Sequence, residues 1–131
     1  MRTILTIFMI IFLASCSKEK FEFNSKYSGT YEGNVTIQTA SSGQLYCQGK
    51  FTVSSDGTVK GEVYNIDKTY KKTYSISSGY MKKVSNIKYT ANVNEFGFKI
   101  DFIFIFADNT MNLEIKDYTE GSITKGNMPK K

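Results

Sequence analysis

The chain of 131 residues contains no histidine, one proline, two cysteines and a single arginine. Without histidine, it lacks the usual general base of enzymes and the commonest side-chain ligand of transition metals. This absence excludes nucleophilic catalysis of the Ser-His-Asp and Cys-His kinds. The sequence also lacks a cysteine cluster for zinc, a glycine-rich phosphate loop and a calcium loop of the Asp-x-Asp-x-Asp-Gly type. Two carboxylates, Glu62 and Asp101, are the remaining candidates for acid–base chemistry, although solvated carboxylates on strand faces are the commoner case. We therefore predict no enzymatic activity, no metal and no cofactor.

The charge balance also bears on partners. The formal net charge is +5, and every basic residue except Arg2 is a lysine. Arginine is the side chain best suited to planar recognition of phosphates and bases. Because the only arginine lies at position 2, we predict that nucleic acid is not a partner.

Residues 1–15 have the pattern of an export signal. Arg2 gives a positive start, and residues 4–13 are apolar apart from Thr6. This apolar stretch is about half of the roughly 20 residues needed to span a bilayer. A short apolar stretch between a basic start and small residues, here Ala14 and Ser15, is typical of a cleaved signal peptide. We expect the residues near Ile4 to Leu13 to be helical and to make few contacts with the barrel.

Residues 13–16, Leu-Ala-Ser-Cys, resemble the lipobox of bacterial lipoproteins. The resemblance implies that Cys16 receives a diacylglycerol thioether and that the signal is cut off immediately before it. Two or more lipid chains anchor a protein stably, because each buried CH₂ group contributes about 0.8 kcal/mol. Residues 16–26 are then the lipidated cysteine and a flexible, mostly polar tether. The expected location is the bacterial cell envelope, with the lipid on Cys16 in the outer membrane. Both faces of that membrane, periplasmic and cell-surface, stay open as alternatives.

From residue 27 to residue 127 the apolar residues alternate with polar ones, which is the pattern of β-strands. Short turns, such as Asp56-Gly57 and Asp108-Asn109, divide this region into eight strands. The most apolar strand carries Phe98, Ile100, Phe102 and Phe104 on one face, which we expect to line the interior. The all-β fold class follows, as an eight-stranded antiparallel up-and-down meander closed into a barrel, because closure removes exposed edges. A β-sandwich is the alternative, and residues 128–131 are expected to fray.

Part of this domain also resembles the small, lipocalin-like barrel lipoproteins of Gram-negative bacteria. The residues that carry the resemblance are Gly29-Thr30-Tyr31, Gly33, Phe51, Val53, Asp56-Gly57 and Gly61. They are turn residues and inward-pointing residues, so the resemblance implies a fold and no chemistry.

With Cys16 assigned to lipid, Cys47 has no partner for a disulfide within the chain. It alternates in phase with Leu45, Phe51 and Val53, which places it on an apolar face. A free cysteine in such surroundings behaves as a small hydrophobic residue. We expect Cys47 to be buried and inert.

Tyrosines and lysines recur within one stretch of the chain, namely Tyr70, Tyr74, Tyr80, Tyr89, Lys82 and Lys83. One interpretation is a cationic, aromatic rim around the mouth of a barrel, and the other is a core tyrosine stripe with solvated lysines outside. Two functions therefore stay open for this non-catalytic domain. It binds a small apolar or amphiphilic ligand, which needs a cavity of about 300 Å³ or more, or it is a protein-interaction module with a solid core, such as an inhibitor or an envelope-assembly factor.

Overall fold

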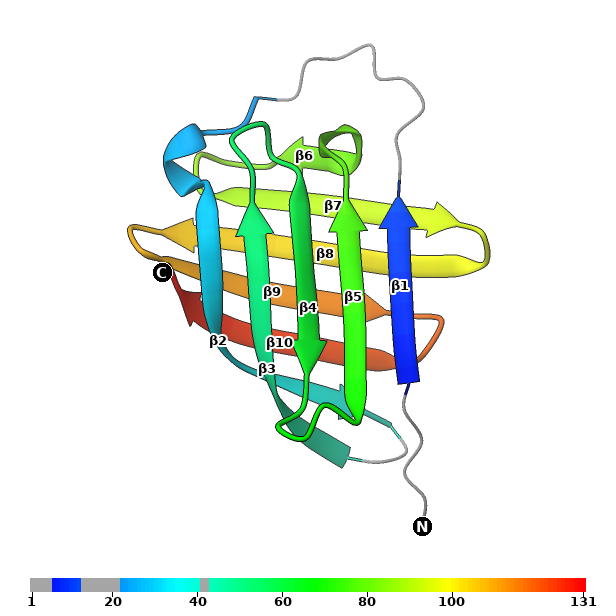
Figure 1. Ribbon diagram of the computed structural model, residues 1–131. Helices are drawn as coiled ribbons and strands as arrows, with labels where there is room; N and C mark the ends of the chain where they lie inside the picture. The colour runs from blue at the N-terminus through cyan, green and yellow to red at the C-terminus, as the bar shows by residue number, and fades with distance from the viewer. Residues whose placement is uncertain (1–5, 13–21, 41–42) are drawn as a thin grey trace.

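The computed structural model describes residues 6–12, 22–40 and 43–131, and for residues 6–12 it describes the backbone alone. Ten strands form one continuous sheet (Figure 1). The strands are β1 (Thr6–Phe12), β2 (Gly29–Thr39), β3 (Gly43–Val53), β4 (Val59–Tyr64), β5 (Tyr70–Ile76), β6 (Met81–Lys83), β7 (Lys88–Glu95), β8 (Phe98–Ala107), β9 (Thr110–Asp117) and β10 (Ser122–Pro129). Two 3₁₀ turns, η1 (Ser25–Tyr27) and η2 (Ser78–Tyr80), complete the secondary structure. Among these residues, no helix is long and apolar enough to cross a membrane.

Strands β2 to β10 form an antiparallel meander, which confirms the predicted all-β class and its barrel-like arrangement. Strands that follow each other in the chain pair with each other, except β5 and β6, and the ends meet because β10 pairs with β2 from Ser122 opposite Thr39 to Gly126 opposite Val35. Pairing of the first and last strands distinguishes a barrel from a sandwich. The sheet order nevertheless has two ends, because β6 is the last strand on one side and β1, which lies beside β5, is the last on the other. The sheet is therefore a curled half-barrel, open between β5 and β6, instead of a fully closed barrel.

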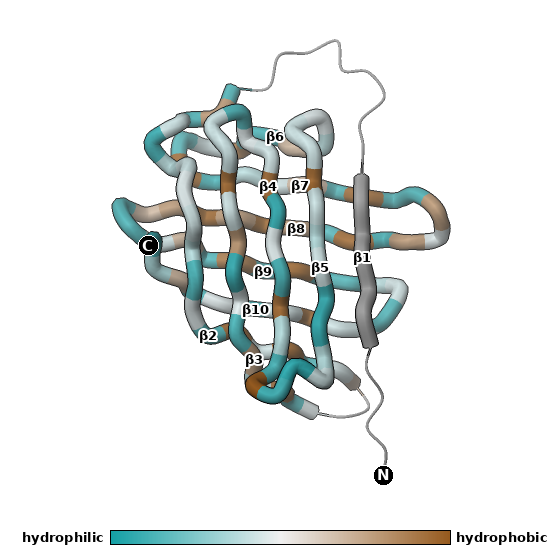
Figure 2. The backbone as a smooth tube through the Cα atoms, in the orientation of Figure 1, coloured by the Kyte–Doolittle hydropathy of each residue, from teal (hydrophilic) through white to brown (hydrophobic). Residues whose placement is uncertain are grey.

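The sheet curls so that β2 to β5 lie across β7 to β10 in two layers (Figure 1). The space between the layers is filled by large side chains with almost no exposure to solvent. Phe102 on β8 meets Tyr74 on β5 edge to face, with ring centroids 5.6 Å apart. The fully buried large residues are Tyr31, Phe51, Tyr74, Ile76, Tyr89, Ile100, Phe102, Phe104, Phe106, Met111 and Leu113. The apolar face predicted for residues 98–104 is confirmed, with Phe98 half-buried at its edge. Along these strands, hydrophobic and hydrophilic colours alternate in Figure 2.

Two expectations about strand limits are wrong. The sequence predicts eight strands, but Met81–Lys83 forms an additional short strand, β6, against residues 89–91 of β7. Three residues are too few to produce a readable alternation. The last residues were expected to fray, yet β10 continues to Pro129, and Met128 is fully buried. The backbone N–H of Lys131 also donates to the Thr30 carbonyl at 2.8 Å, so the C-terminus is tied to the edge of β2.

The helix expected within residues 4–13 is also contradicted, because Thr6–Phe12 forms strand β1. It pairs in parallel with β5, from Thr6 opposite Tyr70 to Phe12 opposite Ile76. The reason is that β5 ends the meander with a free row of backbone donors and acceptors. A segment rich in isoleucine and phenylalanine has the residue types that strands favour. Cys16 and the proposed cleavage point lie outside the described residues.

Residues 16–26 were expected to be a flexible tether, and the part from residue 22 onward is not. Phe23 packs on Tyr89 with ring centroids 4.9 Å apart and approaches Phe106 at 5.9 Å. The Asn24 side chain accepts a hydrogen bond from the Lys26 backbone at 3.1 Å and so caps η1. The buried core residues that the structure describes, together with Phe23, fall between residues 23 and 128, so a chain starting at Ser17 retains all of them.

Cys47 lies on β3 with 4% of its surface exposed, which confirms that it is buried. Desolvation by this burial raises the pKa of its thiol. A raised pKa lowers the fraction of reactive thiolate at neutral pH. Both effects favour the packing role that the alternation predicts.

Candidate functional site

The six residues of the tyrosine–lysine stretch do not form a common rim. Tyr74 and Tyr89 are in the core, with 2% and 0% exposure. They belong to different parts of it, because Tyr74 contacts Phe51 and Phe102 whereas Tyr89 contacts Phe23 and Phe106.

The other four residues of the stretch lie nearer the surface. Tyr70 and Tyr80 are half-buried and pack against the core. The Tyr80 hydroxyl also donates to Glu95. Lys82 and Lys83 are exposed on β6. This distribution is that of core tyrosines with solvated lysines outside, which is the second of the two interpretations.

The two lysines nevertheless lie beside the point where residues 23 and 24 contact the barrel. Lys83 is the register partner of Tyr89. Tyr89 is also the contact of the N-terminal segment, since Phe23 packs on its ring and the Asn24 N–H donates to its hydroxyl at 3.3 Å. In Figure 1 the segment before η1 and strand β6 lie at the same end of the molecule. The end of any N-terminal tether is thereby placed next to exposed positive charge.

A buried charged cluster, which the sequence analysis did not identify, lies between β5 and the turn after β9. The side chain of Lys72 is only 5% exposed, and its Nζ lies 2.7 Å from Glu120 Oε1 and 3.7 Å from Asp117 Oδ2. Asp117 is buried as well and accepts a hydrogen bond from the Glu120 backbone N–H at 2.9 Å. The signal was present in the sequence, because Lys72 alternates in phase with the inward residues Tyr74 and Ile76.

Two opposing influences act on the Lys72 ammonium. Burial is the largest and lowers the pKa, because it removes water from the charged form. The hydrogen bond from Lys72 to Glu120 and the negative charges nearby outweigh it, so the pKa of Lys72 is raised overall. Lys72 is therefore charged at neutral pH and is neutralised locally by its carboxylate partners. This arrangement is a structural ion-pair cluster.

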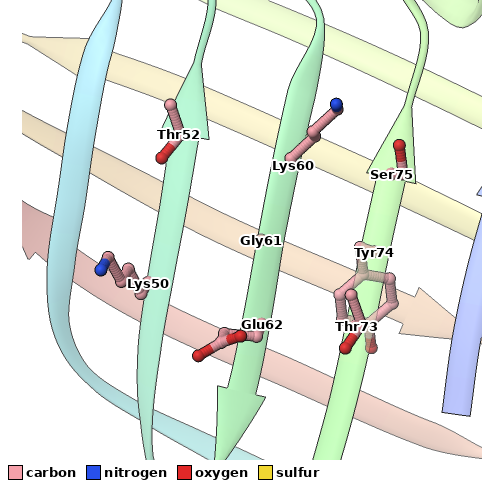
Figure 3. Close-up of a pocket in the computed structure, with 8 residues that line it drawn as sticks. All are labelled: Lys50, Thr52, Lys60, Gly61, Glu62, Thr73, Tyr74 and Ser75. Carbon is pink, nitrogen blue, oxygen red and sulfur yellow. The ribbon is translucent and has the colours of Figure 1, made fainter.

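A hollow of about 410 Å³ lies on the outer surface of β3, β4 and β5 (Figure 3). The register explains how its walls form, since each outward residue of β4 lies between outward residues of the adjacent strands. Lys60 lies opposite Thr52 and Ser75, and Glu62 lies opposite Lys50 and Thr73. Gly61 lies between these two rows, beside Tyr74. The result is a polar ring of two lysines, one glutamate and three hydroxyl groups around Gly61.

Gly61 is required at the centre of this hollow for a reason on the inner side of the sheet. A β-carbon at position 61 would clash with the ring of Phe51, which occupies that space. Phe51 is fully buried and packs with Tyr74 at 6.2 Å between ring centroids. The floor of the hollow is therefore a thin part of the sheet supported directly by core aromatics.

The hollow is positively charged. Glu62 pairs with Lys71, with 3.6 Å between Oε2 and Nζ. Among the residues that the structure describes, no carboxylate lies within ion-pairing distance of Lys50 or Lys60. Two lysines and several hydroxyl donors suit an anionic or strongly polar group. Over the described ranges no cluster of three or more potential metal ligands occurs.

Comparison with protein families, curated proteins and solved structures found no match for this chain.

Proposed function

We propose that the chain is the precursor of a lipid-anchored envelope protein whose non-catalytic barrel works as a binding module at a membrane surface. The lipid is carried by Cys16, the mature protein comprises residues 16–131, and the membrane is the outer membrane. The observation that carries the proposal is the position of Phe23 on Tyr89, beside exposed Lys83. The stretch between Cys16 and Phe23 spans at most about 25 Å even when fully extended. A lipid on Cys16 therefore keeps the β6 end of the barrel within reach of lipid headgroups.

The packed interior supports binding through the outer surface. Phe102, Phe104 and Phe106 fill the space in which a lipocalin-like barrel would hold an apolar ligand. A solid core is the arrangement expected of an interaction module, and its candidate surfaces are the lysines of β6 and the hollow over Gly61.

The anchor is tested with Cys16→Ser in the full-length precursor. We expect this substitution to abolish incorporation of labelled palmitate and to stop cleavage before residue 16, because only the lipid-modified cysteine is the substrate of that cleavage. Palmitate labelling, the mass of the protein and its fractionation with membranes are the measurements. Cys47→Ser serves as the control, since it removes the other cysteine and should leave labelling intact. A Cys16→Ser protein that still takes up palmitate and remains with membranes would show that the lipobox interpretation is wrong.

The membrane-facing end is tested with the soluble chain that starts at Ser17. Replacing Lys82 and Lys83 together by glutamine should weaken binding to phosphatidylglycerol vesicles, by about 1 kcal/mol for each lysine near the surface. The effect should be larger at low salt than at physiological salt, because salt screens surface charges. Vesicle cosedimentation measures it.

Lys50→Gln with Lys60→Gln provides the matched control, because it removes the same charge from the outer hollow, away from the tether. Equal weakening by both pairs would mean that vesicles respond to net charge alone. Absence of binding at either salt concentration would remove the membrane-facing role of β6.

A second candidate function is the binding of a small anionic ligand, such as a phosphate-bearing or carboxylate-bearing molecule, in the hollow over Gly61. It is favoured by the ring of lysines and hydroxyl groups around a site of about 410 Å³. Titration of the soluble chain with inorganic phosphate, followed by amide NMR, should shift the signals of Lys60, Thr73 and Ser75 first. Lys60→Gln should weaken the interaction roughly fivefold, as the loss of about 1 kcal/mol from one charged contact predicts. Shifts spread evenly over all lysines, Lys82 included, would count against the site.

A further inference from the structure

Strand β5 forms one end of the antiparallel meander and accepts a strand from a distant part of the chain. Its inner neighbour is β4, paired from Val59 opposite Ile76 to Tyr64 opposite Lys71. On its other side lies β1, the only strand in the described sheet that runs parallel to its neighbour. All seven residues of β5 have a register partner in β1. The outer edge of β5 is thus regular enough to bind an extended segment over its full length.

We propose that this edge is a strand-acceptor site in the mature protein, and that its occupant is an extended, uncharged, apolar segment of a partner protein. The proposal rests on the processing proposed above, because cleavage before Cys16 removes all of β1. The seven residues of the β5 edge then lose their partner in the sheet. Adding a strand to an exposed sheet edge is an established mode of peptide recognition, in which main-chain hydrogen bonds provide the affinity.

No other described strand is placed to cover the β5 edge after cleavage. Strand β6 follows β5 in the chain, but it lies at the opposite end of the sheet order and pairs with β7. The connection between them, through η2, is too short to add a strand. Unpaired N–H and C=O groups along an edge are a template for another chain. The edge is therefore left to a partner.

The charges on β5 also leave the edge accessible. Lysine on an edge strand is a common device against unwanted pairing. Here Lys72 points inward, where Glu120 and Asp117 hold its ammonium group, and Lys71 is drawn toward Glu62 on β4. Neither lysine projects freely beyond the edge. A charged partner strand would gain little there, whereas an apolar one matches the segment that occupies the edge before cleavage.

The chemistry of the occupant is taken from that segment. Residues 6–12 read Thr-Ile-Phe-Met-Ile-Ile-Phe, with no charge and no proline or glycine. Isoleucine and phenylalanine are among the residues that strands favour most. We accordingly expect a parallel strand of about this length and composition.

The test uses the soluble chain from Ser17 to Lys131 and a fluorescent peptide with the sequence of residues 6–12 flanked by lysine pairs. We expect saturable binding measured by fluorescence anisotropy. A control peptide carrying Met9→Pro should bind at least about tenfold more weakly, because proline removes a ladder hydrogen bond and does not fit inside a strand. Equal binding of the two peptides would overturn the proposal, since it would indicate nonspecific apolar association.

Register provides a second measurement that depends on position. In a Cys47→Ala background, Thr73→Cys on β5 should form a disulfide with a peptide carrying Met9→Cys, because Met9 and Thr73 are register partners. A peptide carrying Thr6→Cys should react more slowly with the same protein. Thr52→Cys, exposed on β3 away from this edge, is the matched control and should react with neither peptide selectively. Crosslinking that ignores these positions would overturn the acceptor site.

The outcomes separate this inference from the proposed function. If the protein purified from membranes retains residues 1–15, the proposed processing is wrong, and the acceptor site is overturned with it because β1 occupies the edge permanently. If the protein is processed and lipidated but its soluble chain binds neither peptide, only the acceptor site is overturned. Light scattering shows whether the chain forms a dimer. If the peptide does not dissociate this dimer, and if Thr73→Cys links its two copies by a disulfide, a second copy of the chain occupies the edge instead of a partner protein.

Discussion

Replacing Phe102 by alanine is expected to lower the free energy of unfolding by about 3–5 kcal/mol. Phe102 lies at the centre of β8 with no exposed surface. It contacts Tyr74 edge to face and stacks on Phe104 at 6.2 Å between ring centroids, so its ring joins the two layers of the sheet. Removing the ring leaves a cavity that neither layer can close without moving its backbone. For a domain of this size, the loss is a large fraction of the total stability.

Urea denaturation of the soluble chain, followed by circular dichroism, measures the effect of Phe102→Ala. Ile105→Ala on the same strand is the matched control, because Ile105 points outward with 37% of its surface exposed. We expect the control to cost about 1 kcal/mol or less. A loss of less than about 1 kcal/mol for Phe102→Ala would mean that the inner face of β8 has been assigned incorrectly, since a shift of one residue turns every side chain to the other face.

Lys72→Met should destabilise the protein by about 3–5 kcal/mol at neutral pH, the usual result of removing one partner from a buried ion pair. Methionine preserves most of the volume of the lysine stem, so the loss reports mainly the charge. Asp117, with 3% exposure, would remain buried without its cation. Adding Asp117→Asn to this variant should recover part of the loss, and a double-mutant cycle gives the interaction energy. Full additivity of the two substitutions would show that the pair contributes nothing.

The pH dependence of this effect has a definite sign. Burial lowers the pKa of Lys72. The Glu120 hydrogen bond and the nearby negative charges outweigh it, so the pKa is raised above the ordinary value of 10.5. A group whose pKa is higher in the folded state stabilises the fold while it is protonated in both states. The contribution of the Lys72 ammonium to the stability difference between the wild type and Lys72→Met should therefore be present from neutral pH up to pH 10.5 and shrink as the pH rises further. A difference that does not shrink above pH 10.5 would contradict this.

The sequence predicted those parts of the fold in which local chemistry and the final structure agree. The alternation of Phe98 to Phe106 is strong because one whole face of β8 is buried. The turn at Asp108-Asn109 is confirmed by the pairing of Ala107 with Thr110 on either side of it. In these places the turn residues fix the register, and the register fixes which face is inside.

Other features could not be predicted because they depend on contacts between distant residues. The charge of Lys72 favours the surface, although its phase agrees with the buried Tyr74. The carboxylates that compensate it come from the end of β9 and from the turn that follows it. Phe23 lies in a polar stretch, so only the presence of Tyr89 in space makes it part of the core. The hollow over Gly61 likewise depends on the register of three strands, which no single strand specifies.

The pairing of β2 with β10 has a consequence for how this protein reaches its folded state. Val35, near the beginning of the domain, lies opposite Gly126, near its end. The two halves of the meander are joined through this single ladder, so neither layer can be covered by the other until the last strand is available. Topologies dominated by such distant pairings fold slowly, on the scale of milliseconds to seconds. The domain therefore cannot complete its fold before β10 is available to pair with β2, and removal of β10 by truncation should leave no partially folded domain.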